Sequence, residues 1–392
     1  MSITERKSNY ELLRIVSMFF IVTFHTICHG QALSLCENST LKFILNIIVL
    51  ITLVHVNSYI MVTGYFQSNS KFKQSNVWAL INSNLFYRIV ILIILSITGY
   101  VTMNALEIFK ETFIINFTEY WFVRVYLILY CISPFLNKLI QNLEKSEFKK
   151  LLFIVFIIFS VLPFISNNQI ISNDGFTLSQ FIFMYLLGAY LRIYPLKESY
   201  IFKRVNVNKF RIICIFGFFF CVFQNYLLTN TSISILGTNS IIDEIANNFI
   251  NGNLSYSNPI IILQTIFYFS LFSTINIKSK FVNKIASLSL GVYLFHDNQL
   301  IKNNFRIYQF LKIGTGPIYS VKYIFHIFAA IVCIFVFGII IEFVRQQIFK
   351  FIYNLKISKK IRDKYYKFYN TLWQSIVVKK WYFYYNNVCN NI

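Results

Sequence analysis

The chain has 392 residues, of which 56% are hydrophobic and only 13% charged, and its formal net charge is +21. Soluble globular proteins carry about 25% charged residues, so this composition excludes an ordinary soluble domain. Apolar runs of roughly 20 residues, the length of a helix that crosses the hydrocarbon core, recur along the chain. Because these runs are continuous rather than alternating, they exclude a β-barrel and predict an all-α polytopic membrane protein.

Ten apolar segments are predicted to span the membrane. In chain order they are 12–29, 43–66, 77–103, 120–140, 150–165, 177–194, 211–229, 259–276, 285–303 and 322–345. The fifth segment is short, and Pro163 is expected to mark its end because proline is disfavoured inside a helix. Residues 1–345 are therefore predicted to form one membrane-embedded domain.

Lys and Arg are distributed unevenly between alternate loops. If the N-terminus is cytoplasmic, the inner loops carry seventeen basic residues before residue 302, whereas the outer loops carry only Lys42 and Lys110. Cytoplasmic loops favour Lys and Arg, so both termini are predicted to be cytoplasmic. The segment 302–322 is an exception, because its four basic residues, Lys302 among them, would lie outside.

Residues 346–392 form a basic, aromatic-rich segment, which contains "KISKKIRDKYYKFYNTLWQSIVVKKWYFYYNN". We interpret it as a cytoplasmic tail on the membrane surface, with aromatic rings at headgroup level and lysines facing lipid phosphates. Anionic lipid is thus its expected partner. Nucleic acid is bound by the same residue types, but the adjacent membrane accounts for them, so no nucleic-acid partner is expected.

The first apolar segment carries three ionisable residues: Glu11, Arg14 and His25. A charged side chain at a helix centre costs at least ~2.5–3.5 kcal/mol on insertion scales, so such groups are functional candidates. Arg14 and His25 are eleven residues apart, about three helical turns, which places them on one face and on the order of 16 Å apart. They would form a polar track along the helix. Alternatively, Arg14 reaches the lipid headgroups and His25 bonds a neighbouring helix.

Further ionisable residues fall inside other apolar segments: His55, Arg88, Arg124, His296, Asp297 and His326. By their depth along the predicted helices, His25, His55, Arg88 and His296 would share a layer near the midplane. Imidazole accepts and returns protons near neutral pH, and a guanidinium holds a phosphate or carboxylate bidentately. These residue types suit group transfer from an anionic co-substrate, and they suit proton-coupled transport equally well. The scattered cysteines indicate no metal site.

Several motifs resemble those of the acyltransferase family 3 membrane proteins, which acylate, usually acetylate, cell-surface polysaccharides and other acceptors. The spacing Arg14-x10-His25 is one of them. Four more follow in the family's order: "VNSYIMVTGYF" (56–66), "YWFVRVYLILYCISPFLN" (120–137), "FIFMYLLGAYLR" (181–192) and "SLSLGVYLFHDN" (287–298). The sequence departs from the pattern at "NSNLFYRIV" (82–90), where many members have two arginines three apart and this chain has Leu85 and Arg88.

The resemblance implies a membrane-bound O-acyltransferase of the bacterial cytoplasmic membrane. Acetyl-CoA would be the acyl donor, and a capsule or exopolysaccharide, or its lipid-linked precursor, the acceptor; no metal is expected. His25 would be the catalytic histidine and Arg14 its companion. Residues expected to bind the donor or the acceptor are Glu11, Tyr65, Arg88, Trp121, Arg124, His296 and Asp297.

The resemblance leaves two mechanisms and two other functions open. His25 would either deprotonate the acceptor hydroxyl or first become acylated itself. A transporter or flippase taking part in polysaccharide export is the main alternative function. A polysaccharide polymerase is the more distant one, because it would favour a larger outer loop than the longest one here, about 230–258.

The distribution of basic residues generates a test of topology. In a variant without native cysteines, Arg204→Cys and a cysteine at position 360 should be shielded from a membrane-impermeant thiol reagent in intact cells. Glu111→Cys, in a predicted outer loop, should react. Labelling of position 204 or 360 from outside would overturn the orientation.

Overall fold

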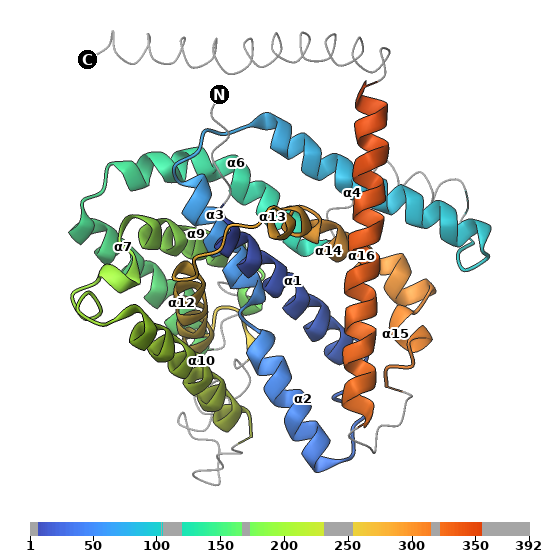
Figure 1. The fold of residues 1–392 in the computed structure, drawn as a ribbon, viewed down its shortest axis with the longest axis horizontal. Coiled ribbons are helices and arrows are strands. Elements are labelled where there is room, and N and C mark those ends of the chain that lie inside the picture. Colours follow the sequence, from blue (N-terminus) through green and yellow to red (C-terminus); the bar gives the residue numbers. More distant parts are fainter. Residues whose placement is uncertain are drawn as a thin grey trace. The chain divides into compact units, whose positions relative to one another are not determined.

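The computed structural model describes residues 7–102, 104, 120–166, 173–230, 254–314 and 322–354. Every regular element in these residues is helical, which confirms the all-α fold class (Figure 1). The chain divides into two compact units, Met1–Ile339 and Ile340–Ile392. The predicted tail, 346–392, lies outside the described residues beyond Asn354.

The helices and their bounds are α1 (Ser8–Cys28), α2 (Ser39–Thr52), α3 (His55–Gln67), α4 (Gln74–Ile97), α6 (Trp121–Gln141), α7 (Lys145–Phe156), α8 (Leu162–Ser166), α9 (Leu178–Ile193), α10 (Val207–Asn230), α12 (Pro259–Ser273), α13 (Lys280–Ala286), α14 (Ser289–His296), α15 (Ile307–Phe310) and α16 (Lys322–Asn354). Within the first unit α1 is the central element, because it packs against α2, α3, α12, α13 and α14.

Within the described residues, seven helical stretches are long and apolar enough to cross a membrane. They comprise α1, α4, α6 and α16, together with Ser39–Gln67, Lys145–Ile165 and Val207–Leu228. Two shorter apolar helices, α9 and α12, coincide with the predicted sixth and eighth spans. The multi-pass membrane character is therefore confirmed, whereas the count of ten is not, and the cytoplasmic position of the termini stays a prediction.

The ninth predicted span, 285–303, is not one continuous helix. It consists of the end of α13, the short helix α14 and a π-helical turn, Leu300–Asn304, with breaks at 287–288 and 297–298. Hydropathy reports the composition of a segment and not its hydrogen bonding, so it did not reveal the breaks. Irregular backbone at membrane depth is tolerated where it is enclosed by protein or lines a cavity.

Pro163 does not end its helix, contrary to expectation. α7 continues through a π-helical turn, Ile157–Val161, into α8, which runs to Ser166. Proline has no N–H to donate to a helical hydrogen bond. Because the π-helical turn has already shifted the hydrogen-bond pattern before Pro163, the helix can continue past it.

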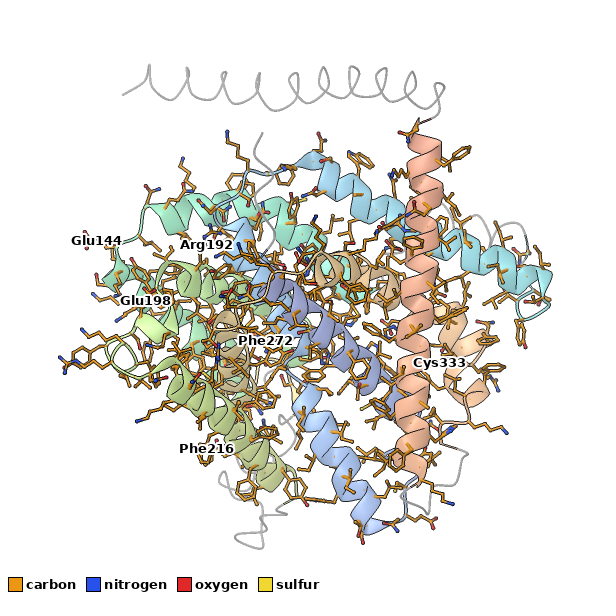
Figure 2. All side chains as sticks on the ribbon, viewed as in Figure 1. Glu144, Arg192, Glu198, Phe216, Phe272 and Cys333 are labelled. Carbon is orange, nitrogen blue, oxygen red and sulfur yellow. The ribbon has the colours of Figure 1, made fainter. Side chains whose placement is uncertain are left out.

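The surface of the first unit is consistent with a lipid environment. Large apolar side chains project outward from several helices; Phe216 on α10 is 71% exposed and points away from the neighbouring helices (Figure 2). Ile97 at the end of α4 is 80% exposed. Exposed apolar area on this scale is what a bilayer would cover.

The crossing of α3 and α9 is the most extensive helix contact, and two glycines make it possible. A Cβ atom on Gly64 would overlap the carbonyl oxygen of Tyr185, and one on Gly188 would overlap that of Met61. The two backbones thus approach each other reciprocally, as small residues allow in membrane bundles. Both glycines belong to the quoted motifs at 56–66 and 181–192, so those motifs have a packing role.

This crossing predicts an asymmetry between two glycine substitutions. Gly188→Ala should lower stability by about 1–3 kcal/mol, because the added methyl group meets rigid backbone. Gly217→Ala should cost less, since its Cβ would meet the ring of Phe267, a side chain that can turn aside. Thermal unfolding of the detergent-solubilised variants measures both. Equal decreases in Tm for the two variants would contradict the conclusion that close backbone contact at Gly188 leaves no room for a side chain.

Candidate active site

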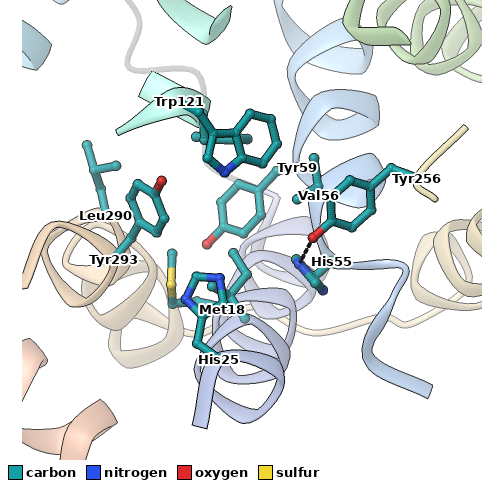
Figure 3. A pocket seen from close by; sticks show the side chains of 11 residues that line it. Met18, His25, His55, Val56, Tyr59, Trp121, Tyr256, Leu290 and Tyr293 are labelled. Carbon is teal, nitrogen blue, oxygen red and sulfur yellow. Dashed lines mark hydrogen bonds between the residues drawn. The ribbon is translucent and has the colours of Figure 1, made fainter. Parts of the chain in front are cut away.

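A cavity lies between α1, α3, α6 and α14, and it is closed on one side by the loop before α12 (Figure 3). The space between its lining atoms is about 410 Å³, a value that counts open solvent at the mouth as well as the interior. The lining residues are Met18, Ile21, His25, His55, Val56, Tyr59, Trp121, Phe122, Tyr256, Leu290 and Tyr293. An apolar and aromatic wall with a few polar atoms is the usual composition of a small-molecule site.

His25 lies in the last turn of α1, and its ring is oriented by α14. Its Nδ1 is 3.1 Å from Nε2 of His296, and Nδ1 of His296 is 2.6 Å from the carbonyl oxygen of Val292. A carbonyl only accepts, so Nδ1 of His296 carries the proton and its Nε2 is an acceptor. Nδ1 of His25 then donates to it. A neutral His25 therefore keeps its lone pair on Nε2, which bonds no other described residue and is available as a base.

Asp297 provides the negative charge nearest to this pair. Its Oδ1 is 3.6 Å from Nδ1 of His25 and 2.8 Å from Nζ of Lys302. Its residue is 4% exposed, so the carboxylate acts in a low-dielectric setting where charge interactions are strong. Asp297 can stabilise a His25 imidazolium, and Lys302 balances the carboxylate while His25 is neutral.

The opposite wall contains a second, fully bonded histidine. Nδ1 of His55 is 2.5 Å from the carbonyl oxygen of Thr52, so it is the donor. Its Nε2 therefore accepts, at 3.0 Å, the hydroxyl proton of Tyr256 (Figure 3). Both ring nitrogens of His55 are thus bonded, and the pair fixes the ring of Tyr256, on which Trp121 is stacked. We assign His55 a supporting role.

Side chains hold the irregular loop that carries Tyr256. Nδ2 of Asn57 and Nε2 of Gln180 donate to the Tyr256 carbonyl oxygen at 2.8 and 3.0 Å. The hydroxyl of Ser160 donates to the backbone carbonyl oxygen of Ser257 at 2.6 Å. All three donors are buried. The loop can therefore lie inside the bundle without leaving these carbonyls unsatisfied.

Arg14 lies beyond Tyr59, outside the cavity wall. Its Nη1 is 3.3 Å from Oε2 of Glu11, and its guanidinium lies 5.9 Å from the centre of the Tyr59 ring. The Tyr59 hydroxyl donates to the Arg14 carbonyl oxygen at 2.9 Å. The Arg14 side chain remains 38% exposed. Glu11 and Arg14 thus pair with each other outside the cavity, whereas His25 bonds the neighbouring helix α14, as the alternative interpretation of the sequence expected for His25. A continuous polar track along α1 stays a prediction.

Three other predicted site residues lie away from the cavity. Tyr65 is at the end of α3, where it contacts Lys7 and the guanidinium of Arg192. Arg88 is buried in α4 and Arg124 is half-buried on α6, but neither lines the cavity. Their role in donor binding stays a prediction. The structure does bring four predicted site residues together at the cavity. His25 and Trp121 line it, and His296 and Asp297 lie beside the His25 ring.

Four residues at or near the site were not predicted from the sequence: Tyr59, Tyr256, Tyr293 and His29. His29 follows His25 by one turn, and the ring centres are 4.7 Å apart. Tyr293 precedes His296 by three residues, which places both on one face of α14. These two helical spacings were signals available in the sequence. Tyr256 precedes its helix in a loop, so no periodicity marks it.

One group of side chains in the described residues has the proximity of a metal site: His25, His29 and Asp297, whose candidate ligand atoms lie within 4.8 Å of one another. The carboxylate is already paired with the ammonium of Lys302, and Nδ1 of His25 with His296. These bonds fit a proton-transfer site better than a divalent cation site, and the expectation of no metal stays a prediction.

The comparisons with known proteins identify the family. A family model described as an acyltransferase domain matches residues 7–345. The chain belongs to acyltransferase family 3. No curated protein and no solved structure matches it. The match spans both units as far as residue 345, and it includes every residue of the cavity. Residues 7–345 are accordingly an acyltransferase domain that contains several apolar helices.

The hydrogen bond between the two histidines generates a prediction for acyl transfer. His296→Ala should lower the transfer rate about 10–100-fold, because His25 loses the acceptor that fixes its tautomer, a typical cost for an orienting partner. His296→Gln, whose amide oxygen can still accept, should restore part of the rate. The pH–rate profile should change in the alanine variant, which a merely structural role would not require. Equal rates for both variants would contradict the orienting role.

Proposed function

We propose that the protein transfers an acetyl group from acetyl-CoA to a hydroxyl of a cell-surface polysaccharide, a capsule or exopolysaccharide, in the bacterial cytoplasmic membrane. The observation that carries the proposal is the bonding of His25. Its Nδ1 is committed to His296, and its Nε2 is left as a base beside an aromatic cavity. A histidine in this state can take a proton from an alcohol.

The length of α1 supports donor and acceptor entry from opposite ends. Arg14 lies on the order of 16 Å before His25 along the axis, and His29 about 6 Å beyond it. The partly exposed Arg14 suits the phosphates of a cytoplasmic acyl-CoA. His29 is exposed, so an acceptor sugar, free or lipid-linked, can approach from that end.

The reaction then proceeds by proton and acyl transfer around His25. Nε2 takes the proton from the acceptor hydroxyl as its oxygen attacks the thioester carbonyl carbon. The carbon–sulfur bond breaks, and the imidazolium returns the proton to the leaving thiolate. An acyl-histidine intermediate would use the same lone pair.

The decisive experiment replaces His25. His25→Ala should abolish O-acetylation of the purified polysaccharide, with a loss of at least the 10²–10⁴-fold typical of a general base, while the protein level in the membrane stays normal.

His326→Ala is the matched control, because this histidine bonds the carbonyl oxygen of Leu311 and does not line the cavity. It should retain acetylation. A well-expressed His25→Ala protein with normal acetylation would defeat the proposal and favour the role in polysaccharide export.

A further inference from the structure

The Tyr293 hydroxyl is a polar group of the cavity that takes part in none of the hydrogen bonds described above. The hydroxyl of Tyr293 is buried and makes no hydrogen bond of ordinary geometry with any described residue, although the carboxylate of Asp297 lies near enough to interact with it. Tyr293 is 4% exposed and lines the cavity. A buried donor without an acceptor is costly to the folded state, so its retention points to a partner that arrives with the substrate.

The other tyrosine hydroxyls of the cavity are already committed. That of Tyr59 donates to the carbonyl oxygen of Arg14, and that of Tyr256 donates to Nε2 of His55. Among the three tyrosines that line the cavity, Tyr293 is therefore the one whose hydroxyl proton is not held in a hydrogen bond of ordinary geometry by a described residue.

The position of Tyr293 is tied to that of the base. It precedes His296 by three residues on α14, the helix that orients His25. Figure 3 shows the Tyr293 hydroxyl on the Trp121 side of the cavity, across from the His25 ring. A thioester carbonyl between them would have the base on one side and a hydroxyl donor on the other.

We propose that Tyr293 is the oxyanion donor of the transfer reaction, an inference that rests on the proposed function. When the acceptor oxygen attacks the carbonyl carbon, the π electrons move to the carbonyl oxygen. The Tyr293 hydroxyl hydrogen-bonds this oxyanion while His25 holds the acceptor's proton. The electrons return as the carbon–sulfur bond breaks, and Tyr293 keeps its own proton throughout. The cavity wall is mostly apolar and aromatic, and a preorganised donor acts strongly in such a low-dielectric setting.

Tyr293→Phe tests the proposal, because it removes the hydroxyl and preserves the ring that packs against Phe122 and Tyr120. With purified protein, acetyl-CoA and the acceptor polysaccharide, kcat should fall about 10²–10³-fold, the effect of losing one oxyanion donor. KM for acetyl-CoA should stay close to the wild-type value, since the bond strengthens only in the transition state.

Tyr268→Phe is the matched control. Tyr268 also has a buried hydroxyl without a hydrogen bond of ordinary geometry to a described residue, but it packs against Phe20 and Phe272 and does not line the cavity. Its kcat should equal that of the wild type. Thermal unfolding of both variants shows whether either substitution has disturbed the fold.

The outcomes separate the two proposals. If Tyr293→Phe is folded and turns over at the wild-type rate while His25→Ala is inactive, the oxyanion role is wrong and the transferase stands. The same holds if Tyr268→Phe loses as much kcat as Tyr293→Phe. If the wild-type protein transfers no acetyl group, the proposed function itself fails.

Discussion

The hydrogen bond between His25 and His296 is the interaction on which the site depends. It joins residues 271 positions apart in the sequence, and it holds only if α14 packs against α1 at the right depth. In a bilayer there is no water to satisfy a displaced ring nitrogen, so polar groups must find protein partners. The carbonyl of Val292 begins this chain of bonds, and the free Nε2 of His25 ends it. The packing of α1 against α14 therefore sets the tautomer of the base.

The sequence predicts the membrane helices and the ionisable residues of the site better than it predicts the breaks between helices and the contacts between their side chains. Composition and hydropathy predict membrane helices because the bilayer selects for long apolar segments, and His25, His296 and Asp297 stand out because hydrocarbon penalises ionisable groups. The breaks on either side of α14 escape the same reasoning, since an apolar segment keeps its hydropathy when its backbone turns. Arg88 shows a further limit of periodicity. Its position along the predicted helix indicates a depth near the midplane of the membrane. That position does not indicate which neighbouring helix the Arg88 side chain faces.

The ion pair of Lys302 gives a physical reason for one of the four basic residues that depart from the basic-residue count. A lysine in a predicted outer segment counts against the topology when each charge is treated as free. In the structure its ammonium lies 2.8 Å from the Asp297 carboxylate, and its side chain is only 21% exposed. A lysine that neutralises a buried acid is retained for that pairing, whatever the side of the membrane, so it carries little information about orientation.

The breaks in the chain also shape the electrostatics of the reaction. α1 ends at Cys28, within a turn of His25, and α14 ends at His296, so the carboxyl ends of two helices converge on the ring pair. Helix carboxyl ends carry partial negative charge and favour a cation, and the Asp297 carboxylate adds to this field. A proton taken from the acceptor hydroxyl is thus accommodated on His25. A continuous helix over 285–303 would carry its backbone past His25 without ending there; the break at 297–298 is what brings a helix terminus and a carboxylate to the base.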